Sequence, residues 1–227
     1  YKEYACHLMD IALMMRNPKL GRNLVALNVV YDDDHMRQHQ EEGIRLLEEV
    51  SEYASSSDVS VQTQVRIAAN IANGIKHAFK EFRASEILIG MHMHDKVSAK
   101  FWGEFHQSLF NGLHRQIMMA RLYHPLSTLR RIVVAVPSRA QYEPCFYRWL
   151  ERLSRMAENI ECRVQFSGRT DTLQIINQFI TNRHPNVRAI YQTMEHWNEL
   201  PRLATTIAND HLFVVVTARK GTVSNKT

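Results

Sequence analysis

Hydrophobic positions along the first half of the chain switch repeatedly between helical spacing and the short apolar runs typical of strands. Helical spacing predicts helices over residues 6–18, 36–54 and 69–84, and apolar or alternating runs predict strands over residues 23–30, 59–67 and 86–91. Helices that alternate with strands favour a parallel sheet with right-handed crossovers. The first half is therefore predicted to be an α/β domain.

The same pattern returns in the second half. Strands are predicted over residues 131–137, 160–168, 187–193 and 211–221, and helices over residues 142–158, 172–183 and 200–210. Residues 117–123 are predicted to be the last strand of the first half, so we expect two tandem α/β domains, residues 1–126 and 127–227. The first lacks a strand before its opening helix, and the second lacks a helix and a strand after its last one. Each domain is thus expected to be incomplete at one end, within a longer polypeptide.

Amino-acid composition indicates the cellular compartment and disfavours some classes of partner. Three widely spaced cysteines, an odd number, favour free thiols in a reducing, intracellular compartment over a disulfide framework. The net charge is +5, with acidic and basic residues interleaved and no basic stripe with aromatic residues, so nucleic acid is not an expected partner. The longest apolar runs, residues 132–136 and 212–216, are far shorter than the ~20 residues that cross a bilayer.

A glycine-containing loop after the third predicted strand is the main candidate for ligand chemistry. Gly90 ends that strand, and thirteen residues later Gly103 precedes a helical run that we expect it to open. A glycine turn and a helix N-terminus at the carboxyl end of a parallel strand can offer backbone N–H groups to a phosphate. The segment resembles the G-x2-G-x9-G-[ST] phosphate motif of universal stress proteins. The candidate ligand residues are therefore Gly90, Met91, His92, Met93, Gly103 and Glu104, with Val29 and Val30 at a neighbouring strand end.

Two departures from that motif disfavour a nucleotide. Met93 stands where the motif has its second glycine and hinders close backbone approach, and Glu104 replaces the hydroxyl residue with a negative charge. A carboxylate at a helix start contributes about 0.3–1 kcal/mol with the helix dipole, and it fills the place of an anion. In the second half, Pro137 ends the first strand where universal stress proteins usually carry aspartate. We expect no cofactor, although adenine nucleotide in the first half stays an alternative.

Other chemistry has weaker support. His92 and His94 alternate along an extended segment, and Asp95 or Glu104 would complete a metal site, but with twelve histidines in the chain a close pair is expected by chance. We predict no metal site, and a pH-sensing role for histidine stays open. G-x-S-x-G, Walker, CxxC and HExxH patterns are missing from the sequence, so we do not expect an enzyme.

Two further segments, RLYHPLSTLRRIVVAVPSRAQYEP (residues 121–144) and VVVTARKGTVS (residues 214–224), resemble the C-terminal region of bacterial monovalent cation/proton (Na⁺/H⁺) antiporters of the cation/proton antiporter 2 family. The resemblance implies two Rossmann-like domains of universal stress protein type, related to adenine nucleotide alpha hydrolases. It also implies a non-catalytic regulatory role in ion transport, on the cytoplasmic side of the bacterial inner membrane. The implied partners are the membrane transport domain of the same polypeptide and a second copy of the chain.

Two alternatives remain beside this interpretation. A stand-alone tandem universal stress protein would bind ATP and would need an intact glycine motif in at least one half. A scaffold for homo-oligomerisation would use strand edges to pair between chains. The transported ion and the effector are not predicted by any residue in the sequence.

Overall fold

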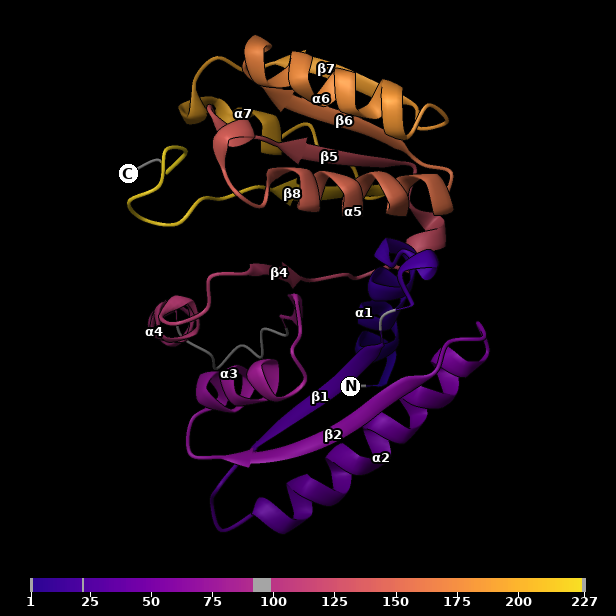
Figure 1. Ribbon diagram of the computed structural model, residues 1–227, viewed down its shortest axis with the longest axis vertical. Helices are drawn as coiled ribbons and strands as arrows, with labels where there is room; N and C mark the ends of the chain where they lie inside the picture. Colours follow the sequence, from indigo (N-terminus) through magenta and orange to yellow (C-terminus); the bar gives the residue numbers. More distant parts are fainter. Residues whose placement is uncertain (1, 22, 92–98, 226–227) are drawn as a thin grey trace. The chain divides into compact units, whose positions relative to one another are not determined.

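The computed structural model describes residues 2–21, 23–91 and 99–225, which divide into two compact units (Figure 1). The first unit comprises Tyr1–Leu13 and Pro18–Tyr123, and the second comprises Met14–Asn17 and His124–Thr227. The sequence placed the division three residues later, after residue 126. Each unit is an α/β structure with parallel strands.

The first unit contains two parallel strand pairs with helices between them in sequence. β1 pairs with β2 from Leu24↔Val61 to Tyr31↔Ala68, and β3 pairs with β4 from Glu86↔Gln116 to Gly90↔Ala120. Its elements are α1 (Lys2–Met15), a 3₁₀ turn (Pro18–Leu20), β1 (Leu24–Tyr31), α2 (Met36–Ser55), β2 (Val61–Ala68), α3 (Ile71–Glu81), β3 (Glu86–Gly90), α4 (Ala99–Phe110) and β4 (Gln116–Ala120).

The two strand pairs do not join into the continuous parallel sheet that the alternation of elements predicts. Helix α1 contacts both of them. Met9 lies in a buried cluster with Val50 of α2 and Val61 of β2, and Leu8 lies beside Gly90, where an added Cβ would be 3.3 Å from the Leu8 Cδ2 atom. Side-chain packing on α1, in place of main-chain hydrogen bonds, therefore connects the described strand pairs.

Helix α3 packs closely against β1 because one of its residues has no side chain. A Cβ at Gly74 would lie 2.7 Å from the Val29 Cγ1 atom and 3.2 Å from the Ala68 Cβ atom. Gly103 in α4 is the contrasting case, because a Cβ there would meet no atom within 4 Å. Identical residues on two helices of this unit thus have opposite steric surroundings.

The second unit is built on one four-stranded parallel sheet with the strand order β7-β6-β5-β8. Its elements are β5 (Arg131–Ala135), α5 (Phe146–Asn159), β6 (Arg163–Gly168), α6 (Thr170–Arg183), β7 (Ala189–Thr193), α7 (Leu200–Ala204) and β8 (His211–Val215), with 3₁₀ turns at Leu126–Thr128, Ala140–Tyr142 and Trp197–Glu199. Chain order runs outward from β5 through β6 to β7 and then returns to β8 on the other side of β5. The switch in direction therefore falls beside β5.

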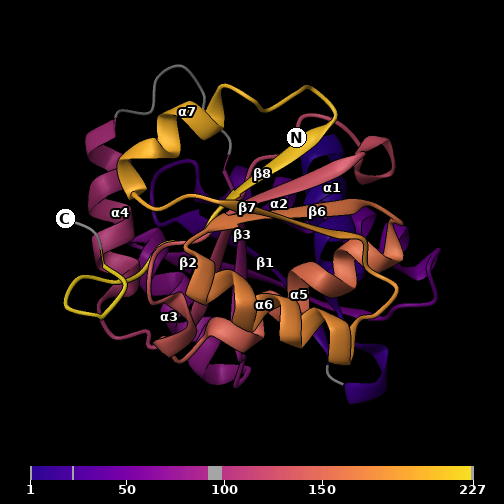
Figure 2. The same ribbon diagram turned by 90° about the horizontal axis from the view of Figure 1, so that it is seen from above.

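Helices cover both faces of this sheet. α5 and α6 lie on one face and α7 on the other (Figure 2). Val133 and Ala135 of β5 pack with Leu203 of α7 in one buried cluster, and the alternating direction of strand side chains turns Val134 to the opposite face. Phe146 and Leu150 of α5 are fully buried. The predicted apolar strand over residues 131–137 is thus the centre of a two-sided core.

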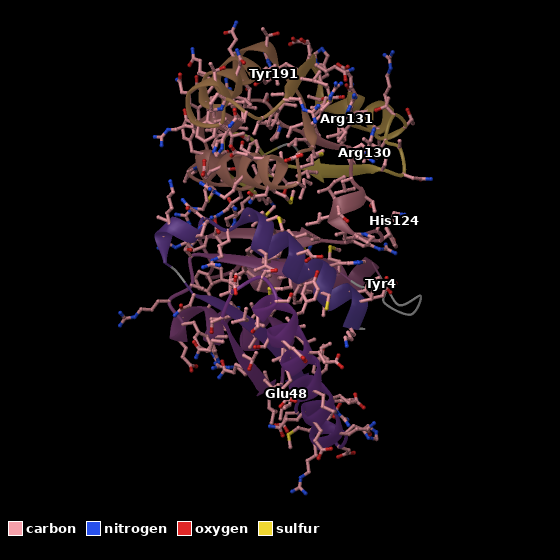
Figure 3. The ribbon with its side chains drawn as sticks, turned by 90° about the vertical axis from the view of Figure 1, so that its right-hand side faces the viewer. Tyr4, Glu48, His124, Arg130, Arg131 and Tyr191 are labelled. Carbon is pink, nitrogen blue, oxygen red and sulfur yellow. The ribbon has the colours of Figure 1, made fainter. Side chains whose placement is uncertain are left out.

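A row of polar side chains crosses the α7 face of the sheet. Arg131, labelled in Figure 3, donates from Nη1 to the Gln165 Oε1 atom at 3.1 Å, and the Gln165 Nε2 atom donates to the Gln192 Oε1 atom at 2.7 Å. On the other face, the ring of Tyr191 stacks on Phe166 at 6.0 Å, and burial raises the pKa of Tyr191 to about 12. The row joins side chains of β5, β6 and β7.

A buried histidine fastens the end of α6 to α5. The His184 Nε2 atom lies 2.6 Å from the Glu151 Oε2 atom, and its Nδ1 atom lies 3.0 Å from the Glu158 Oε2 atom. Only 5% of His184 is exposed. Burial acts to raise the pKa of Glu151, but hydrogen bonds from His184 and Arg155 outweigh it and leave that pKa below its ordinary value. Ionised Glu151 is therefore part of the folded structure.

Matched glycine substitutions test the packing of the first unit. Gly74→Ala should lower the free energy of unfolding by roughly 1–3 kcal/mol, because overpacking against Val29 exceeds the helix-propensity gain of about 1 kcal/mol. Gly103→Ala should raise it by about 0.5–1 kcal/mol, since its site is open. Urea unfolding followed by circular dichroism measures both, and equal effects of the two substitutions would contradict this packing.

The pH dependence of unfolding tests the His184 contacts. A carboxyl whose pKa is lower in the folded than in the unfolded protein stabilises the fold above the unfolded pKa, and this contribution disappears as pH falls through the folded pKa. Glu151→Gln should therefore cost roughly 1–3 kcal/mol at pH 7 and flatten the loss of stability below about pH 4.5. Urea unfolding from pH 7 to pH 3 measures this. Asp210→Asn, the control, removes a carboxylate whose side chain is 52% exposed. In this variant the free energy of unfolding should fall between pH 7 and pH 3 as steeply as in the unaltered chain.

Candidate functional site

The residues predicted from the glycine motif are spread over three elements of the first unit. Val29 and Val30 lie near the end of β1, and Gly90 ends β3. The Met91 amide donates to the Ala120 carbonyl oxygen at 2.8 Å, which extends the β3–β4 ladder by one residue. His92 and Met93 lie outside the described residues, as do His94 and Asp95. Gly103 and Glu104 lie in α4.

The prediction that Gly103 opens a helix is wrong. α4 begins at Ala99, four residues earlier. Only the first four N–H groups of a helix lack partners within it, so the Gly103 amide is already inside the hydrogen-bonded part. Glu104 likewise lies beyond the first turn, where the dipole effect has faded. A glycine in a helical pattern can mark a helix boundary, but here the four residues before Gly103 already belong to α4.

Packing against α1 explains why residue 90 is a glycine, without any ligand. The Leu8 side chain lies so close that an added Cβ would be 3.3 Å from the Cδ2 atom. The absence of a side chain at this strand end thus accommodates α1.

The described cavities lie instead at the carboxyl edge of the sheet in the second unit. Main-chain bonds from the Val136 amide to Ser167 O (2.8 Å) and from the Met194 amide to Gly168 O (2.7 Å) extend the ladders to this edge. A cavity of about 120 Å³ opens there, lined by Val136, Ser138, Arg169, Met194, Glu195, His196 and Trp197. Its walls come from the segments that follow β5, β6 and β7.

A larger cavity adjoins the first. It measures about 430 Å³ and is lined by Ser138, Arg139, Tyr142, Arg169, Asp171 and Val223. Ser138 and Arg169 line both spaces, so the two cavities share part of their lining. In open parallel sheets, ligands bind beyond the carboxyl ends of the strands at the point where the chain order reverses. Beside β5, this edge is such a point. We refer to the larger space as the edge cavity.

Local backbone geometry brings these segments together. A Cβ at Gly168 would lie 3.1 Å from the Val136 carbonyl oxygen, so glycine permits the close approach of β6 to the chain leaving β5. β6 ends at Gly168 and α6 starts at Thr170, so Arg169 is the single residue between the strand and the helix. The Thr172 hydroxyl donates to the Gln141 Oε1 atom at 2.8 Å and ties the first turn of α6 to the 3₁₀ turn after β5.

Charges at the edge are balanced and partly solvated. The Arg169 Nε atom lies 3.8 Å from Asp171 Oδ1 and 3.9 Å from Glu195 Oε2, and all three side chains are at least half exposed. Both distances exceed hydrogen-bond length, so the guanidinium can turn to an incoming acceptor without breaking a direct bond. Asp171 lies in the first turn of α6, where a carboxylate suits the helix dipole. A carboxylate at a helix start, expected at Glu104, is thus found in the second unit.

The residues of this edge lie outside the glycine motif, so the motif does not predict them as a site. A local signal existed, since polar residues follow within three positions of the ends of three predicted strands, as Ser138 and Arg139, Arg169, and Glu195 and His196. Their meeting depends on the strand order, which the sequence does not give. Within the described ranges, no group of three or more His, Cys, Asp or Glu side chains is placed to hold a metal ion.

Of three comparisons with known proteins, the one with solved structures finds a protein of similar fold. No protein-family model matches the sequence, and the search of curated proteins finds no match. Among solved structures, a universal stress protein from Archaeoglobus fulgidus DSM 4304 matches with a TM-score of 0.58 and 13% sequence identity, over 89% of this chain and 75% of that chain. The chain has a universal-stress-protein-like fold. This confirms the predicted α/β class and the universal-stress-like part of the resemblance, and at this identity it establishes the fold alone. None of the helices in the described residues is long and apolar enough for a membrane span.

Proposed function

We propose that the chain is a regulatory domain that binds a small anionic ligand in the edge cavity. The observation that carries this proposal is the pair Arg139 and Arg169, which line one cavity of about 430 Å³ together with the hydroxyl residue Ser138. Guanidinium groups and hydroxyls are the side chains that recognise oxyanions. The cavity lies where parallel α/β sheets bind their ligands.

The charge balance favours an anion of low charge. Asp171 lines the edge cavity with the two arginines, and Glu195 lies 3.9 Å from Arg169. Two positive and two negative side chains leave no surplus to neutralise a triphosphate. A small oxyanion or phosphate monoester, which would displace Arg169 from its long ion pairs, fits this arrangement better.

Solvation supports binding over catalysis. Arg169, Asp171 and Glu195 have side chains that are 51%, 60% and 50% exposed. Electrostatic stabilisation of a transition state is strongest in a site that excludes water, and half-exposed charges are screened. We therefore propose a non-enzymatic role in which the ligand changes the population of conformations.

The finer proposal is that the domain regulates a bacterial monovalent cation/proton antiporter. The two segments that carry the resemblance, residues 121–144 and 214–224, lie 70 residues or more apart in sequence and meet at the edge cavity. The Ser224 amide donates to the Glu143 Oε1 atom at 2.8 Å, and Val223 lines the cavity with Ser138. The residues behind the resemblance and the residues behind the proposed binding site are therefore partly the same.

In this proposal the transport domain belongs to the same polypeptide and tethers the chain to the cytoplasmic side of the inner membrane, and two copies act as a dimer. A coupling free energy of about 1–3 kcal/mol between ligand and transporter would be enough for regulation. The rival candidates are a stand-alone universal stress protein that binds ATP, favoured by the 75% coverage of the Archaeoglobus fulgidus protein, and an oligomerisation scaffold.

Calorimetric titration tests the binding proposal with inorganic phosphate and with ATP as probes. Arg169→Ala should weaken phosphate binding roughly 10- to 100-fold, as loss of hydrogen bonds to a charged group predicts. Arg183→Ala removes an exposed arginine at the other end of α6 and should leave affinity unchanged. ATP binding that is tighter than phosphate binding and insensitive to Arg169→Ala would contradict the proposal and favour the stand-alone alternative.

Ion exchange by the intact antiporter tests the regulatory proposal. Deleting this region, or introducing Arg169→Ala, should shift the pH or cation dependence of exchange, because both remove the ligand's bias on the transport domain. Proton flux in everted membrane vesicles, followed with a pH-sensitive dye, measures the shift. Profiles that superimpose on those of the unaltered transporter would contradict regulation and support a structural role.

A further inference from the structure

The chain that follows β8 passes along the edge cavity as a compact series of turns. The Val216 amide donates to Ala135 O at 3.0 Å and continues the β8–β5 ladder beyond the end of β8. The Thr222 amide then bonds to Arg219 O at 3.1 Å and the Asn225 amide to Thr222 O at 3.2 Å. We call residues 217–225 the C-terminal strap.

The far end of the strap is attached to the loop after β5. Ser224 is only 1% exposed, although its neighbour Val223 is 54% exposed. The Ser224 amide donates to the Glu143 Oε1 atom at 2.8 Å, and Glu143 directly follows the 3₁₀ turn Ala140–Tyr142. The buried Ser224 Oγ atom has no hydrogen-bond partner within the described residues, so the hydroxyl adds nothing to this attachment.

The hydrogen bond between Glu143 and Ser224 positions Val223, which lines the edge cavity. Val223, the residue before Ser224, contributes an apolar residue to the lining of the cavity, which also includes the polar residues Ser138, Arg139 and Arg169. Glu143 follows Arg139 by four positions, so one short loop carries both a cavity-lining arginine and the carboxylate that holds the strap. The Gly221 backbone has φ +87°, a left-handed conformation that gives the strap its turn beside this wall.

We propose that Glu143 is a positioning residue, whose hydrogen bond to the Ser224 amide holds the strap against the edge cavity and limits access to Ser138, Arg139 and Arg169. This inference rests on the proposed function of the cavity as a binding site. Glu143 does not line the cavity itself, so its effect on access passes through Val223 and the strap. One hydrogen bond to a carboxylate favours the attached arrangement and still permits opening.

A cysteine reporter tests access without any ligand. Ser138→Cys is introduced into the 227-residue chain, and its rate of reaction with a small neutral methanethiosulfonate reagent is measured, with the rate of the chain lacking this substitution subtracted. Adding Glu143→Ala should raise the rate roughly tenfold, the change expected on losing one hydrogen bond to a charged group. Glu143→Gln keeps a carbonyl oxygen as acceptor and should give an intermediate rate. Glu48→Ala removes an exposed carboxylate from α2 in the first unit (Figure 3) and should leave the rate unchanged.

Hydrogen exchange provides a second readout in the same variants. A peptide that covers residues 217–225 should exchange faster with Glu143→Ala, and peptides from β5 and β6 should keep their protection, which shows that the fold is intact. Equal reporter rates, or unchanged exchange of the strap, would overturn the inference. Failure of the proposed function is distinguishable, because absent phosphate binding would leave both of these ligand-free results as they are. If Glu143→Ala prevents folding, Glu143→Gln decides by the same two measurements.

Discussion

Burial of β5 on both faces is the constraint on which the second unit depends. A parallel strand with neighbours on each side has its main-chain groups paired along its length, and the remaining requirement is apolar cover above and below. α5, α6 and α7 supply that cover, and Ile132, Val134 and Ala135 are fully buried as a result. The ends of the strands are then the places where main chain, charged side chains and water meet. The cavities at the carboxyl edge follow from this arrangement.

The local pattern of apolar residues is enough to predict most helices and strands. A buried strand such as β5 appears as a short apolar run, and an amphipathic helix such as α5 has apolar residues at helical spacing, because both patterns follow from which side chains are buried. Strand pairing in the first unit was not predictable in the same way. The two strand pairs are connected through helices, and the position of α1 places Leu8 against Gly90 and Met9 against Val50 and Val61. That position is a property of side-chain fit between distant segments, and the spacing of apolar residues within one segment does not encode it.

The candidate site shows the same division between local and long-range information. The sequence could indicate that a polar residue follows a strand end, as at Ser138 or Arg169, but three separate loops and the segment after β8 must assemble before a cavity exists. Glycines illustrate why a motif alone misleads. The carbonyl oxygen of Val136 lies close to Gly168, and the side chain of Val29 lies close to Gly74. Gly103 has open space around it, although all three positions are glycine. Only the atoms around a glycine decide what its missing side chain allows.

The contacts of His184 have a mechanical consequence for α6. The helix is about 21 Å long at 1.5 Å per residue, and His184 follows its last residue, Arg183. The carboxylates of Glu151 and Glu158 on α5 contact the His184 imidazole at this end of α6. The first turn of α6, near Thr170, lies beside the edge cavity. The helix is thus anchored at its far end by His184, and a displacement of its first turn would have to be a tilt about that anchor that also breaks the Thr172–Gln141 hydrogen bond.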